Sequence, residues 1–166
     1  MAKGDVRIVR SPYNTIPTMT LQTEANATDI NAGEPVKWKS AGSPYAIPLA
    51  TLDLTIGTDT QFLGIAQSAS THTASADGVV EVYMPLPGVV YGMAATTAAN
   101  VDTQAELDAL VGDRVVMTLA SSTYTLDEDA GDGATNAFYI VGGDPTTQEM
   151  HFTVRLDATY LSGESV

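Results

Sequence analysis

The sequence predicts a mainly β protein, a single antiparallel β-barrel or sandwich-like domain with one short helix and an extended N-terminal arm. Short runs of alternating apolar and polar residues recur along the chain, separated by turns rich in glycine, proline and aspartate. Only one segment has helical periodicity, and no internal repeat or linker divides the 166 residues. We therefore assign residues 1–20 to the arm and residues 21–166 to the single β-rich domain.

The expected arm is defined by its prolines and its charge. Pro12 and Pro17 lack an N–H and bias the residue before each of them towards extended geometry. The arm also holds three of the seven basic residues in a chain of net charge −13. We expect it to contact acidic patches on a partner or on a neighbouring copy, and its removal (residues 1–12) to leave the body folded. A frayed terminus is the alternative for residues 1–5. The predicted contact residues are Lys3, Val6, Arg7, Ile8, Val9 and Arg10.

The body is expected to consist of about eight to ten short strands. In residues 36–39, for example, Val36 and Trp38 alternate with two lysines, which predicts that both belong to the core. Including this one, the predicted strands of the body are at residues 36–39, 47–54, 62–66, 79–84, 89–91, 114–119, 123–126, 138–141 and 150–156.

One helix is expected at residues 104–111. Thr103 stands three residues before Glu106, the spacing of a capping box in which each side chain accepts the other residue's backbone N–H. Apolar residues then recur at helical spacing, and Gly112 supplies a left-handed C-terminal stop.

Composition disfavours several functions. Affinity for nucleic acid and for anionic membranes depends on basic residues, so a chain with 20 acidic and 7 basic residues is expected to bind neither. Without cysteine there is no disulfide framework or thiolate metal site. The sequence also lacks a serine nucleophile motif and a phosphate-binding loop, and its two histidines, His72 in a polar loop and His151 in a strand, are both expected at the surface. We expect a protein that is not an enzyme and needs no metal or cofactor.

The acidic segment 127–133 offers the strongest case for a cation. Asp127, Asp129 and Asp132 could supply oxygen ligands to calcium. In the register of an EF-hand, however, Asp132 falls where glycine is required and Phe138 falls where glutamate is required. A solvated hairpin loop is the favoured interpretation, and an adventitious cation site is the alternative.

Several segments together resemble a known family. Residues 64–67 (Gly-Ile-Ala-Gln), the valine strand ending in residues 84–90 (Met-Pro-Leu-Pro-Gly-Val-Val) and residues 112–115 (Gly-Asp-Arg-Val) carry the resemblance. In organisation, residues 30–120 resemble the small head decoration, or cement, proteins of tailed double-stranded DNA bacteriophages. The resemblance implies a β-rich protein without catalysis, made in the host cytoplasm and located on the outer surface of the virion capsid. It also implies binding to the major capsid protein, as a homotrimer at three-fold and local three-fold positions, often with the help of an N-terminal arm.

Two other classes of function stay open. A tail-tube or fibre-associated β domain of a phage is the main alternative, and such a tube protein would polymerise with itself. A carbohydrate-binding module, with Trp38 or tyrosines as its sugar platform, is more distant and would be monomeric and bind glycans.

Overall fold

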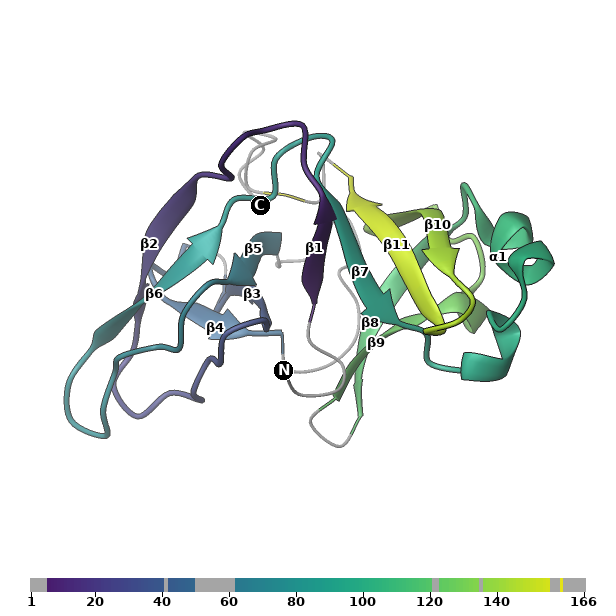
Figure 1. The fold of residues 1–166 in the computed structure, drawn as a ribbon. Coiled ribbons are helices and arrows are strands. Elements are labelled where there is room, and N and C mark those ends of the chain that lie inside the picture. The colour runs from purple at the N-terminus through teal and green to yellow at the C-terminus, as the bar shows by residue number, and fades with distance from the viewer. Residues whose placement is uncertain are drawn as a thin grey trace.

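The computed structural model describes residues 6–40, 42–49, 62–120, 123–134, 136–155 and 159. These residues form two antiparallel sheets that lie side by side, with one α-helix at the outer side of the larger sheet (Figure 1). This confirms the mainly β fold in its sandwich-like form, and neither sheet is a closed barrel. The strands are β1 (Arg7–Arg10), β2 (Thr18–Thr23), β3 (Pro35–Trp38), β4 (Ala46–Pro48), β5 (Phe62–Ala66), β6 (Gly78–Tyr83), β7 (Val90–Ala94), β8 (Arg114–Ala120), β9 (Thr123–Asp127), β10 (Phe138–Asp144) and β11 (Glu149–Val154).

The two sheets repeat one topology. The five-stranded sheet has the order β2-β6-β5-β3-β4, and the six-stranded sheet has the order β1-β7-β11-β10-β8-β9. When β1 is set aside, both sheets have five strands that are consecutive in the chain. Numbered along the chain, these five strands lie in the order 1-5-4-2-3 in each sheet. An isolated parallel bridge then brings the first strand towards the third, between Gln22 and Tyr45 in one sheet and between Ala95 and Leu126 in the other. We call β2–β6 the first repeat and β7–β11 the second repeat, a duplication that the sequence patterns did not reveal.

Two apolar clusters stabilise these sheets. The larger cluster belongs to the six-stranded sheet and is centred on aromatic rings: Phe138 lies 5.7 Å from Phe62 and 5.2 Å from Phe152, both edge-on. The smaller cluster lies within the first repeat. Strand β5 is buried along its whole length and contributes to both clusters, Phe62 to the larger and Leu63 to the smaller. It therefore joins the two sheets through a shared core.

Gly64 lets β5 pack this closely. Its φ is +132°, and a Cβ built there would lie 1.9 Å from the carbonyl oxygen of Tyr83. Gly64 pairs with Val36 of β3, and the β3–β5 register shifts directly after this pair, since Lys37 pairs with Phe62. Only glycine combines that backbone angle with such an approach.

The predicted helix is confirmed as α1 (Gln104–Leu110). Thr103 Oγ1 accepts the backbone N–H of Glu106 at 3.3 Å, and a Glu106 carboxylate oxygen accepts the backbone N–H of Thr103 at 3.0 Å. Gly112 follows with φ at +97°, the left-handed stop that the sequence predicted. The helix buries Leu107 against β10.

The N-terminal segment differs from the expected arm. Residues 7–10 are extended, but β1 pairs antiparallel with β7 as an outer strand of the six-stranded sheet, with Arg7 opposite Gly92. Val6 is only 3% exposed and belongs to the larger apolar cluster. The boundary expected at residue 20 falls inside β2. The physical reason is that burial of Val6 and the β1 backbone pairing outweigh the freedom of a loose arm.

Candidate interaction surface at β1

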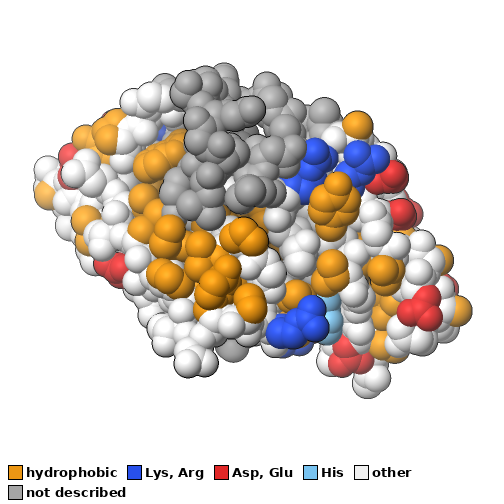
Figure 2. All heavy atoms as spheres, turned by 90° about the horizontal axis from the view of Figure 1, so that it is seen from above, with side chains coloured by type: hydrophobic (Ala, Val, Ile, Leu, Met, Phe, Trp, Pro, Cys, Tyr) orange, Lys and Arg blue, Asp and Glu red, His pale blue; other side chains and the backbone are white. Residues whose placement is uncertain are grey.

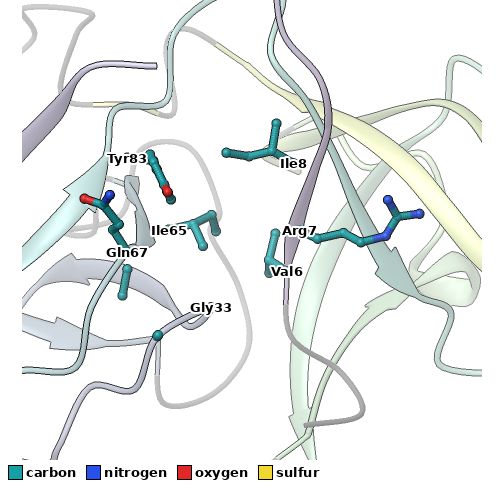
Figure 3. Close-up of a pocket in the computed structure, with 9 residues that line it drawn as sticks. Val6, Arg7, Ile8, Gly33, Ile65, Gln67 and Tyr83 are labelled. Atoms are coloured by element: carbon teal, nitrogen blue, oxygen red, sulfur yellow. The ribbon is translucent and has the colours of Figure 1, made fainter. Parts of the chain in front are cut away.

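A cleft separates β1 from the first repeat. It encloses about 300 Å³ and is lined mainly by apolar groups. In Figure 3, Ile8 of β1 and Val6, the residue before β1, lie on one side of the cleft. Ile65 of β5, Gln67 directly after β5 and Tyr83 of β6 face them from the other side. The Gln67 amide and the Tyr83 hydroxyl are the polar side-chain groups of the first repeat at this cleft. Its chemistry suits binding of an apolar side chain with one or two hydrogen bonds.

The β1 side chains divide between the two faces of the strand. Val6 and Gly33 both line the cleft, and the Val6 backbone N–H donates to the Gly33 carbonyl at 3.2 Å. This bond links the segment before β1 to the segment before β3. Ile8 is half-buried and packs against the larger cluster. Arg7 points away from the cleft (Figure 3). Alternation along an extended chain produces this division.

The opposite face of β1 carries an ion pair. Arg7 Nη2 lies 2.5 Å from Glu149 Oε2, and this hydrogen bond raises the pKa of the arginine. Gly92 makes room for it, since a Cβ there would lie 2.0 Å from Glu149 Oε1 and 2.7 Å from Val9 Cγ2. Arg7 is thus held by the body, although its side chain is still 46% exposed.

The predicted contact residues therefore have different environments. Val6 is buried, Ile8 and Val9 are half-buried, and Arg10 is exposed. Lys3 lies outside the described residues. Four of the six, Arg7 to Arg10, lie on β1, and Val6 directly precedes that strand, so these residues are part of the folded body. Among the contact residues that the structure describes, Arg10 and the exposed part of Arg7 present positive charge to a partner.

An apolar surface adjoins the cleft. The connections at residues 11–17 and 84–89 pack on each other: the Tyr13 hydroxyl donates to the Pro87 carbonyl at 3.1 Å, and a Cβ on Gly88 would lie 3.2 Å from Pro12. Tyr13 is 39% exposed. Figure 2 shows the molecule from above the view of Figure 1. On this face, apolar side chains gather near the middle of the molecule, and lysine and arginine side chains lie beside them. No sequence pattern joined these two connections, which are about seventy residues apart.

The acidic segment is held by donors of the protein itself. Glu128, which the sequence analysis did not single out, is 7% exposed; its carboxylate accepts the backbone N–H groups of Thr96 at 3.1 Å and Thr97 at 2.8 Å. Asn100 Nδ2 donates at 3.2 Å both to Glu128 and to Asp129. These bonds fasten the 3₁₀ turn Ala98–Asn100 to the end of β9.

Asp132 has an arginine partner. Arg114 Nε and Nη2 donate to its two carboxylate oxygens at 2.6 and 2.9 Å, and this pair lowers the pKa of Asp132 to about 2. Among the described residues, no group of three histidine, cysteine, aspartate or glutamate side chains is arranged to hold a metal ion. The carboxylates proposed as calcium ligands instead have partners within the chain, including the backbone N–H of Asp129 for Asp127.

The surface prediction for His72 was wrong. Its side chain is 3% exposed, and Nε2 lies 3.0 Å from the Ala27 carbonyl and 3.3 Å from Asp29 Oδ1. His151 is half-buried on β11. Trp38 is also half-buried, packed against the smaller cluster. The polar residues around His72 in the sequence concealed that its loop folds back onto the chain.

No described helix is long and apolar enough to cross a bilayer. Comparisons with protein-family models, with curated proteins and with solved structures found no match.

Proposed function

We propose that this chain is a structural, non-catalytic virion protein. It decorates the outside of a tailed-phage capsid by binding the major capsid protein, as a homotrimer at three-fold and local three-fold positions. The observation that carries the proposal is the β1 surface, a mainly apolar cleft beside exposed Arg7 and Arg10 on a chain of net charge −13. Such a surface supports attachment to another protein. The capsid as partner and the trimer follow from the sequence resemblance.

Attachment in this proposal uses the folded body. The apolar cleft accepts a side chain of the capsid protein, and Arg10 adds an exposed charge pair of about 0–1 kcal/mol. Many equivalent copies on one shell make such weak contacts effective.

The test is decoration of expanded heads assembled from the major capsid protein of the same genome. Gln67→Trp fills the cleft from an exposed position, and Ala69→Trp, two residues along and outside the cleft lining, is the matched control. We expect saturable binding by the wild-type chain and the control, weak binding by Gln67→Trp, and equal melting temperatures. Native mass spectrometry of the free protein should show a trimer.

Failure of the wild-type chain to bind heads would overturn the proposal. Self-polymerisation into tubes would favour the tail-tube alternative. Full decoration by Gln67→Trp would move the contact away from the cleft.

A further inference from the structure

The outer edge of the first strand differs between the two repeats. In the second repeat, β1 covers that edge of β7, on the N-terminal side of the Ala95–Leu126 bridge. In the first repeat, the same edge of β2 lies on the N-terminal side of the Gln22–Tyr45 bridge, and within the described part of the chain no strand pairs with it there. Figure 1 shows β2 at the outer margin of its sheet.

The backbone of β2 has groups available on this edge. Met84 donates its N–H to the Pro17 carbonyl at 3.0 Å, so the main-chain groups of Pro17 face β6. In an antiparallel strand these groups alternate in direction, which sends those of Met19 and Leu21 to β6 and those of Thr18 and Thr20 outwards. Gln22, the next outward position, is at the bridge to Tyr45. Thr18 and Thr20 thus offer two N–H and two C=O groups to an added strand.

The other outer strands are protected against such pairing. β1 contains a register shift and two arginines, β4 has only three residues and ends at Pro48, and β9 meets Thr96 through the Leu126 carbonyl at 2.8 Å. Charges, prolines and bulges are the usual means of blocking a sheet edge. β2 has none of them: its sequence is Thr-Met-Thr-Leu-Gln-Thr, and its pairing with β6 is continuous over six residues.

Charge indicates the kind of strand that fits. In the second repeat, Arg7 of the added strand reaches across β7 to Glu149 of β11. In the first repeat, β6 takes the place of β11 and carries Glu81 opposite Thr20, whose hydroxyl donates to it at 2.6 Å. Asp77 stands just before β6. Two copies of this chain, each with net charge −13, would bring these carboxylates together, whereas a basic segment would pair with them.

We propose that the free edge of β2 binds an extended basic segment of another protein, which adds to the first repeat as β1 adds to the second. Backbone hydrogen bonds to Thr18 and Thr20 supply the affinity, and an arginine or lysine directed at Glu81 supplies the preference for a basic strand. This inference does not depend on capsid decoration.

The test uses a labelled peptide with the sequence of residues 6–11, Val-Arg-Ile-Val-Arg-Ser, because that strand fits the equivalent edge of the second repeat. Fluorescence anisotropy measures its affinity for the full chain, and amide hydrogen exchange locates it. We expect the exchange of the Thr18 and Thr20 amides to slow on binding. Thr20→Pro removes an outward N–H and should weaken binding about tenfold, while Thr20→Val, which keeps the backbone donor, should not.

Two further measurements keep the test independent of any folding defect in Thr20→Pro. Peptides methylated on alternate backbone nitrogens should bind in one register and fail in the other, because only one set of N–H groups faces β2. Glu81→Gln should weaken binding about threefold and reduce its dependence on salt.

Equal binding of both methylated peptides, or protection confined to β7, would overturn the proposal. Protection of Thr18 and Thr20 in the free protein, rising with protein concentration, would assign the edge to a second copy instead.

Discussion

Replacing Glu128 with alanine is expected to lower the free energy of unfolding by about 2 kcal/mol. The carboxylate is 7% exposed and accepts three N–H groups, from the backbone of Thr96 and Thr97 and from the Asn100 side chain. A donor left without a partner in a buried site costs about 1–3 kcal/mol. Of these three donors, the Thr97 N–H loses its partner, whereas the Thr96 N–H still donates to the Leu126 carbonyl at 2.8 Å and Asn100 Nδ2 still donates to Asp129 at 3.2 Å. The expected loss is therefore that of one buried donor, about 2 kcal/mol.

The measurement is urea denaturation followed by far-ultraviolet circular dichroism. In a domain of this size a loss of about 2 kcal/mol lowers the melting temperature by about 4–8 °C and shifts the urea midpoint without changing the slope. The stability of Glu128→Gln should lie between those of the wild type and Glu128→Ala. The glutamine oxygen can still accept an N–H group, but its NH₂ group is a donor and cannot replace the second carboxylate oxygen. Asp108→Ala is the control, since Asp108 is an exposed residue whose carboxylate accepts a hydrogen bond from the exposed Gln104 side chain. If Glu128→Ala and Asp108→Ala unfold within about 0.5 kcal/mol of each other, the reasoning is refuted.

Two further predictions concern β1 and the Arg114–Asp132 pair. Deletion of residues 1–12 should lower the free energy of unfolding by at least about 2 kcal/mol, because it removes buried Val6, and Arg10→Ala, an exposed control, should not; a deletion variant as stable as the full chain would restore the loose arm. The pKa of Asp132 is about 2 in the folded protein and about 3.9 in an unfolded chain. The stability it contributes is therefore present above about pH 4 and lost as the pH falls towards 2. In acid titrations Asp132→Asn should show a smaller loss over that interval, and an unchanged titration would contradict this role for the pair.

Local patterns predicted the strands and the helix well. The apolar residues at 79–84 and 114–119 identified β6 and β8, and the Thr103 and Glu106 spacing located α1 to within a residue. These features depend on neighbours a few positions away, which a sequence displays directly. The sequence did not predict strand β2, because four of its six residues are threonine or glutamine and few apolar residues mark a buried face. The strand is held in place by its pairing with β6, which is distant in sequence.

The long-range arrangement could not be predicted from periodicity. The duplicated topology depends on which strands pair, and the two repeats share no visible sequence pattern. For the candidate site, the basic and apolar residues of β1 were found by their spacing, but their burial was not. Gln67 and Tyr83 gave no signal, because the cleft exists only where two distant segments meet.

The order of synthesis sets a constraint on β1. Each repeat is continuous in the chain, so the first can assemble on the ribosome before the second has been translated. The strand β1 is made before both, yet its pairing partner Gly92 follows about eighty residues later. At a translation rate of about 5–20 residues per second, β1 must wait several seconds for β7, exposing Val6 and Ile8 meanwhile. A strand that precedes the first repeat in the chain therefore takes its place in a sheet only after that repeat has been made.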